Sequence, residues 1–264
     1  MNKTSIVFAM LLFLYFPSSQ ALVINSVGDE VIEDFSGFSG TGFSPSPLSG
    51  QLDSNTWRVT GLSGGAGTFG GTHDTGDFSR GSASGSVSTG GVYSFNLAGS
   101  GPSLGVQPTG GDFTVGEITL RILNDTAMTL NALSVSYDLF ILNDQLRSSL
   151  FNFSYSHDDL VYTDVLAGET SSAGVADDSP SWEENNFVFM LSGLNILNSE
   201  SFYLRWAGDD NSATGSRDQF GLDNIGVTGF ADMAPTSVPE PESLFLMAAG
   251  LLMLGCRRFM AGRT

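Results

Sequence analysis

Residues 133–141 read LSVSYDLFI, and apolar and polar side chains alternate through most of this stretch. Successive side chains of a β-strand point to opposite faces, so Leu133, Val135 and Tyr137 share one face while the two serines and Asp138 take the other. The pattern predicts a strand that is buried on one face and polar on the other. This strand decides the fold, because the same period recurs along the chain.

The other alternating stretches are 115–123 (VGEITLRIL), 150–156 (LFNFSYS), 186–193 (NFVFMLSG) and 201–208 (SFYLRWAG). Outside the two termini, no comparable stretch has apolar residues at the spacing of an amphipathic helix. Many short strands separated by Gly, Asn, Asp and Ser predict an all-β fold in which two antiparallel sheets pack face to face. The length favours a jelly-roll-like β-sandwich over a smaller immunoglobulin-like domain.

Residues 61–91 do not follow this pattern, because they contain 11 glycines and scarcely any alternation. The segment is either a long loop or a set of poorly packed edge strands, and its glycines and serines either serve a function or line tight connections. It is not a phosphate-binding loop, since no Gly-Lys-Ser/Thr follows it.

The first 21 residues have the three parts of a signal peptide. Lys3 precedes an apolar run at 6–16, and residues 19–21 (SQA) supply small side chains at the −3 and −1 positions. We expect signal peptidase to cut after Ala21. The alternative, a retained anchor, is disfavoured because the apolar run falls short of the ~17–25 residues that span a bilayer.

The C-terminus contains a second apolar run, residues 244–256, which predicts a single hydrophobic helix. Arg257, Arg258 and Arg263 follow it and form a basic tail. Positive charge beyond an apolar helix marks the cytoplasmic side. We therefore expect the body of the protein to be translocated while the tail stops in the inner membrane.

Pro239, Glu240 and Pro241 stand directly before this helix. The order of triplet, apolar helix and arginines over residues 239–264 closely resembles the PEP-CTERM sorting signal of Gram-negative bacteria. The resemblance implies that exosortase, a membrane cysteine protease, removes the tail and that the protein reaches the cell surface or exterior after a transient stay in the inner membrane. Cys256 departs from the commonest pattern and is either a lipidation site or a cysteine at the membrane edge.

Between the two ends lie a β-rich body, residues 22–232, and a linker, residues 233–238. Over residues 22–238 there are six arginines and no lysine against 26 acidic residues, so the net charge is −20. Such a surface excludes a nucleic-acid partner, because binding to phosphates requires Lys and Arg. The body has no cysteine, so neither disulfides nor thiolate sites are available to it.

The body itself resembles a recurrent β-rich ectodomain of secreted bacterial proteins, in stretches such as 50–62 (GQLDSNTWRVTGL) and 202–230. Its closing residues 217–227 (RDQFGLDNIGV) are similar to the last strand of lectin-like jelly-roll modules. This resemblance implies a fold and an extracellular setting. It implies no particular ligand, since modules with this strand bind many different partners.

We expect no enzyme activity. The body offers only His73 and His157 as bases for a hydrolase, and neither accompanies a nucleophile elbow. The candidate elbow at 81–85 (GSASG) has Ala83 at its central position, where a nucleophilic serine is required. With so many acids, the sequence does not single out the carboxylate pair of a glycosidase.

The acidic residues favour calcium binding over catalysis, because calcium takes about 6–8 hard oxygen ligands. One acidic turn and the last strand supply oxygen ligands. The resemblance to lectin-like modules implies two more acids near the N-terminus, because calcium commonly ties the first and last strands of such modules together. The candidate ligands are Asp209, Asp210, Asn211, Asp218, Asp223, Glu33 and Asp34. The alternative is a solvated acidic surface without bound metal.

Sugar binding is the rival function, because exposed aromatic rings stack on pyranose faces. Trp182 stands in a polar stretch and is the best candidate platform, unless it caps a loop. Two functions remain open: a structural or interaction component of the cell surface, matrix or biofilm, which we favour, and a carbohydrate-binding module whose partner is extracellular polysaccharide.

Overall fold

The computed structural model describes residues 21–97, 99–211 and 216–232. The chain divides into two units, Met1–Ala231 and Asp232–Thr264. The expected signal peptide up to residue 20, the linker and the sorting tail with its hydrophobic helix lie outside the described residues. In the described part, no helix has the length and hydropathy of a membrane span.

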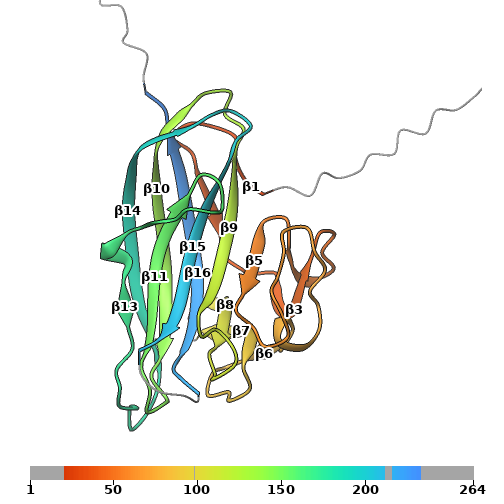
Figure 1. The fold of residues 1–264 in the computed structure, drawn as a ribbon, viewed down its shortest axis with the longest axis vertical. Coiled ribbons are helices and arrows are strands. Elements are labelled where there is room, and N and C mark those ends of the chain that lie inside the picture. Colours follow the sequence, from red (N-terminus) through yellow and green to blue (C-terminus); the bar gives the residue numbers. More distant parts are fainter. Residues whose placement is uncertain (1–20, 98, 212–215, 233–264) are drawn as a thin grey trace, which may run out of the picture. The chain divides into compact units, whose positions relative to one another are not determined.

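Strands account for nearly all regular structure (Figure 1), and the first begins at the residue after the expected signal-peptide cleavage point. The strands are β1 (Leu22–Ile24), β2 (Glu30–Glu33), β3 (Phe38–Ser44), β4 (Gly50–Asp53), β5 (Trp57–Thr60), β6 (Ser82–Ala83), β7 (Gly91–Leu97), β8 (Gly101–Gln107), β9 (Gly116–Asn124), β10 (Leu130–Leu142), β11 (Ser149–Ser156), β12 (Thr163–Asp164), β13 (Thr170–Ser171), β14 (Trp182–Ile196), β15 (Ser201–Asp210) and β16 (Gln219–Phe230). Two short 3-10 turns, η1 (Gly76–Phe78) and η2 (Leu166–Gly168), complete the elements.

Two seven-stranded sheets form the body. Sheet A has the order β1-β9-β15-β11-β12, with β5 also paired to β9 and β13 to β11. Sheet B has the order β14-β10-β16-β8-β7-β6, with β2 also paired to β16. Most pairings are antiparallel, and the small sheet of β3 and β4 is parallel. The predicted all-β architecture with two sheets is confirmed, whereas the jelly-roll order of connections stays a prediction.

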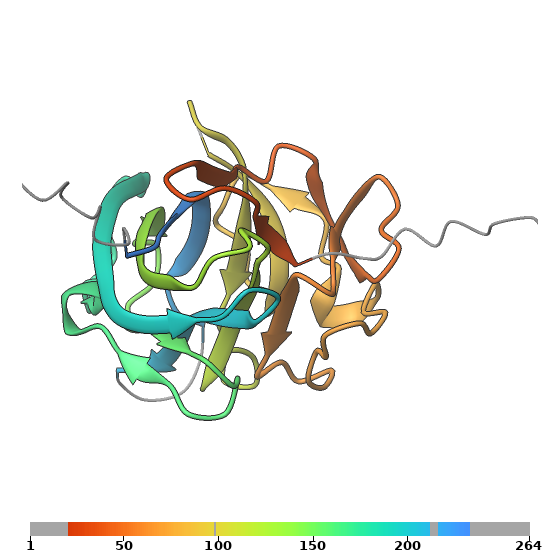
Figure 2. The same cartoon turned by 90° about the horizontal axis from the view of Figure 1, so that it is seen from above.

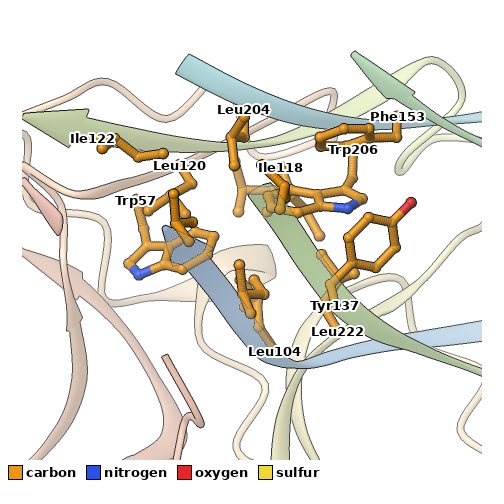
Figure 3. Packing of buried hydrophobic residues seen from close by; sticks show 14 of the residues in the cluster. Trp57, Leu104, Ile118, Leu120, Ile122, Tyr137, Phe153, Leu204, Trp206 and Leu222 are labelled. Atoms are coloured by element: carbon orange, nitrogen blue, oxygen red, sulfur yellow. The ribbon is translucent and has the colours of Figure 1, made fainter. Parts of the chain in front are cut away.

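The alternating stretches of the sequence are strands, as predicted, and their apolar faces meet in one core. Trp206 of β15 is completely buried, with its ring centroid 6.4 Å from that of Trp57 and 5.5 Å from that of Phe153. Tyr137 of β10 meets the Trp206 ring edge-on at 5.4 Å. Figure 3 shows these rings between aliphatic side chains of both sheets. Burial of apolar surface therefore joins the sheets.

The glycine-rich segment 61–91 is mostly irregular and contains only η1 and the two-residue strand β6. In Figure 1 and Figure 2 its neighbourhood, coloured orange, lies beside the long strands. Several contacts tie the segment to the rest of the body; for example, Arg80 N donates to Val92 O at 3.1 Å, Gly81 N donates to Gly40 O at 2.9 Å, and His73 pairs with Phe43 in an isolated bridge. The segment is thus a long loop fastened at several points.

Candidate functional site

Four carboxylates meet where β2, β10 and β16 lie side by side. Asp223 of β16 stands opposite Asp138 of β10, while Glu33, the last residue of β2, stands opposite Ile225 of β16. Asp34 follows Glu33 directly. We call Glu33, Asp34, Asp138 and Asp223 the acid cluster. The structure thereby brings together three of the predicted calcium ligands and adds Asp138.

Asp223 is completely buried, yet only one of its carboxylate oxygens is satisfied. Its Oδ1 accepts a hydrogen bond from Asn224 N at 2.9 Å, whereas Oδ2 is buried without a hydrogen-bond partner. Asp138 is better satisfied, since Asn186 Nδ2 donates to it at 2.7 Å and Asn224 Nδ2 at 2.8 Å. A buried oxygen that lacks a donor is costly, so Asp223 Oδ2 points to a missing partner.

The pKa values of the acid cluster also indicate that Asp223 lacks a partner. Burial first, and then repulsion by Asp138, Asp34 and Glu33, raise the pKa of Asp223 to about 6. Burial also raises the pKa of Glu33. In contrast, the hydrogen bond from the Ser36 backbone N–H lowers the pKa of the exposed Asp34. Mutual repulsion among carboxylates is what a bound cation relieves.

The backbone at the acid cluster has two unusual residues. Phe35 and Asn224 adopt the left-handed region, with φ of 50° and 49°. Asn tolerates this conformation, whereas for Phe it costs on the order of 1 kcal/mol. A hollow of about 400 Å³ lies beside Glu33 and Asp34, between residues 33–38 and 47–52. The turn after β2 therefore holds two acids at the rim of an open space.

A calcium ion at this place would need further ligands. Within the described ranges, no three His, Cys, Asp or Glu side chains are already placed to hold a metal. Calcium also accepts backbone carbonyls, amide oxygens and water, so Asp223 with one or two neighbouring acids fits a site completed in that way. The residues suit calcium in chemistry and charge but do not form a finished cage.

The other predicted ligands lie elsewhere. Asp209 and Asp210 end β15, and Asp210 Oδ2 already pairs with Arg147 at 3.3 Å and Arg217 at 3.5 Å. Asn211 Nδ2 donates to Ser148 Oγ at 3.4 Å. Asp218 precedes β16 and is five residues from Asp223, a separation of about 17 Å along an extended strand. One calcium ion cannot bind the whole predicted set.

Trp182 lies at the start of β14 rather than in a loop, and its ring is half-buried. The ring packs on Phe95 with centroids 5.0 Å apart, and Trp182 Nε1 donates to Ser84 O at 2.9 Å. A Cβ added to Gly85 would come within 3.3 Å of the indole and 2.6 Å of Leu142 Cδ2, so only glycine fits there. Trp182 thus fastens the glycine-rich segment to sheet B.

A different surface carries half-buried arginine and aromatic side chains. On the outer face of sheet A, the strand register places Arg58, Thr119 and Arg205 in one row and Arg121 beside Tyr203 in the next. Phe69 from the glycine-rich segment and Tyr162 from the loop after β11 cover parts of this face. We call Arg58, Arg121, Arg205, Phe69, Tyr162 and Tyr203 the arginine face.

Most cations of the arginine face are paired. Arg58 forms a bidentate ion pair with Asp159, and Arg205 Nη1 lies 2.7 Å from Glu117 Oε1. The Arg205 guanidinium also lies 3.6 Å above the Tyr162 ring. Of the arginines that the structure describes, Arg121 alone takes part in no ion pair, and its guanidinium lies 5.1 Å from the centre of the Phe69 ring. Sequence reasoning missed this face because it depends on strand register.

The sorting residues Pro239, Glu240 and Pro241 and the arginines of the tail lie outside the described residues. In sequence, residues 237–258 match the PEP-CTERM protein-sorting motif. A comparison with curated proteins finds no match.

Solved structures that this chain matches include the CBM22-1 xylan-binding domain from Paenibacillus barcinonensis Xyn10C (8% identity, 80% of this chain and 100% of that chain, TM-score 0.39). Others are the K1 cleaved adhesin domain of Lys-gingipain from Porphyromonas gingivalis (13%, 78% and 100%, TM-score 0.39) and a non-crystalline cellulose specific module, CBM28 (9%, 75% and 97%, TM-score 0.37). Likenesses this distant carry no argument about ligands.

Proposed function

We propose that this chain is an exported protein whose tail exosortase removes, and that its β-sandwich then acts at the cell surface or in the extracellular matrix as a non-catalytic interaction component. The observation that carries the proposal is the PEP-CTERM motif at residues 237–258, placed after the β-rich body. The signal peptide expected at 1–21 supports the same route. A lysine-free body of net charge −20 keeps the exported protein soluble.

We propose further that calcium binds the acid cluster after export. The support is Asp223, whose Oδ2 is buried without a donor beside three other carboxylates. A cation there joins the end of β2 to the centre of β16 and so ties the N-terminal part of the body to its last strand.

The tail is tested by replacing Glu240 and Pro241 together with alanine. The apolar run and the arginines remain, so the double variant should still stop in the inner membrane, but without the recognised triplet it should not be released. Fractionation of cells followed by immunoblotting should find wild-type protein outside the inner membrane and nearly all of the double variant within it.

The matched control for the tail is Glu242→Ala, which removes a neighbouring carboxylate and leaves the triplet intact. This control should be released like the wild type. Release of the double variant with wild-type efficiency and mass would refute sorting by exosortase.

Carbohydrate binding is the second candidate function, and the arginine face favours it. Saccharide sites combine aromatic rings, which stack on sugar faces, with planar donors that orient hydroxyl or carboxylate groups. The face offers Phe69 and Tyr203 beside Arg121, which has no counter-ion among the described residues. Tyr162 adds a third ring beside Arg205. An acidic extracellular polysaccharide is the ligand class that matches this chemistry.

Tyr203→Ser should weaken retention of the protein on immobilised acidic polysaccharide by about fivefold to 100-fold, since loss of one stacked ring removes ~1–3 kcal/mol. The thermal midpoint should change little. Val188→Ser, on exposed β14 of the other sheet, is the control and should bind normally. Loss of retention only in Trp182→Ala would instead place the site at the sequence-predicted platform, and no retention of the wild type would remove this candidate.

A further inference from the structure

A second group of unsatisfied oxygens lies where β10 ends and β16 begins. Asp144 follows β10, while Asp218 and Gln219 stand at the start of β16. Gln219 Nε2 donates to Asp144 Oδ2 at 2.9 Å, and Gln145 N donates to Asp218 Oδ1 at 2.9 Å. We call Asp144, Asp218 and Gln219 the strand-end cluster. It shares only Asp218 with the ligands expected from the sequence.

Each member of the strand-end cluster has one oxygen without a donor. Asp218 and Gln219 are completely buried, and Asp218 Oδ2, Gln219 Oε1 and Asp144 Oδ1 are inaccessible to solvent and lack any hydrogen-bond partner. Because Gln219 Nε2 is bonded to Asp144, the unsatisfied amide oxygen is held directly beside that carboxylate. Within the described part of the chain, neither carboxylate belongs to an ion pair.

A buried carboxylate beside a half-buried one, with no counter-charge, is unfavourable because both lose hydration. Burial raises the pKa of Asp144 and of Asp218, and the charge of Asp144 raises that of Asp218 further. Either protons or a cation can relieve this. A single proton on a carboxyl oxygen satisfies that oxygen and one acceptor, whereas a cation bound among the three oxygens can be shared by all of them.

We propose that the strand-end cluster is a second calcium site, bound through Asp144 Oδ1, Asp218 Oδ2 and Gln219 Oε1. Two carboxylates and an amide oxygen are hard ligands of the kind calcium takes, with water and backbone carbonyls completing the coordination. Asp218 and Asp223 are about 17 Å apart along the strand, far more than twice the ~2.5 Å distance between calcium and an oxygen ligand. One ion cannot bridge them, so this site is separate from the acid cluster.

Calcium at the strand-end cluster would hold the glycine-rich segment against sheet B. Gln219 Nε2 also lies 3.5 Å from Val87 O, and Ser86 faces Asp144, so the glycine-rich segment reaches the strand-end cluster. Calcium here ties that segment, the end of β10 and the start of β16 together. The body has no cysteine for a disulfide, so a metal tie is the cross-link available to it. The proposal depends neither on exosortase nor on the acid cluster.

The test is calcium titration of the purified chain by isothermal calorimetry at pH 7, with Asp223→Asn as the starting variant to impair the acid cluster. This variant should still bind one calcium ion, and adding Asp218→Asn should weaken the remaining binding by at least about tenfold. Asp178→Asn removes an equal charge from an exposed loop and should change nothing.

A second substitution keeps the test decisive if Asp218→Asn fails to fold. Gln219→Glu adds a third carboxylate beside Asp144, so calcium should bind several-fold more tightly and the chain should become less stable in excess chelator. The proposal is overturned if the Asp223→Asn chain binds no calcium, if Asp218→Asn leaves its binding intact, or if Gln219→Glu binds no more tightly.

Discussion

Replacing Trp206 with alanine is expected to lower the free energy of unfolding by about 3–5 kcal/mol, the usual result of removing a buried aromatic side chain. The indole is completely buried and packs against Trp57, Tyr137 and Phe153, so its loss opens a cavity between the sheets. In a domain of this size each kcal/mol moves the thermal midpoint by roughly 2–4 °C, so the midpoint should fall by about 6–20 °C. Circular dichroism on heating measures it.

The matched control is Val188→Ala on β14. Val188 has 73% of its surface exposed, so the change should stay within about 0.5 kcal/mol of wild type. A fall of less than about 1 kcal/mol for Trp206→Ala would contradict its place at the centre of the core.

Calcium should raise the thermal midpoint by about 5–10 °C for each occupied site, the second largest effect. A ligand that binds only the folded state stabilises it by RT ln(1 + [L]/Kd), about 2.7 kcal/mol at a hundredfold excess over Kd. Asp223→Asn should remove the share that comes from the acid cluster. It should also be at least as stable as wild type in excess chelator at pH 7, because it removes a repelled carboxylate without changing its shape.

The free energy of unfolding should depend on pH, and the raised pKa of Asp223 determines the direction of the change. The pKa of Asp223 is raised in the folded state to about 6 and is about 3.9 in the unfolded chain, so between these values the folded state binds more protons. In excess chelator, stability should therefore fall as pH rises from about 4 to about 6, and saturating calcium should offset that fall. Magnesium acting as well as calcium, with Asp223→Asn unchanged, would leave only a solvated acidic surface.

The strands could be predicted from the sequence because each is buried on one face. Alternation in residues 133–141 predicted Tyr137 on the buried face of a strand, and Tyr137 is buried. The stretch 201–208 alternates in the same way, and its Trp206 is buried too. Periodicity failed for Trp182, since the polar residues around it were interpreted as a loop. They belong to an edge strand that continues as far as its pairing with Leu142 of β10.

The sites depend on register, which the sequence does not give. Asp138 stood at a polar position of a predicted strand, but only its pairing opposite Asp223 makes it part of the acid cluster. Asp144 and Gln219 are 75 residues apart and meet through a side-chain hydrogen bond. The resemblance to lectin-like modules did predict that Glu33 and Asp34 lie near Asp223. That expectation depended only on the first and last strands being neighbours, and β2 does pair with β16.

The intact mass of the wild-type protein recovered from outside the inner membrane tests the central claim most directly. Our account predicts one species that lacks residues 1–21 and has lost the apolar run and Arg257, Arg258 and Arg263 from its C-terminus. A released protein that still carries these arginines would contradict processing by exosortase.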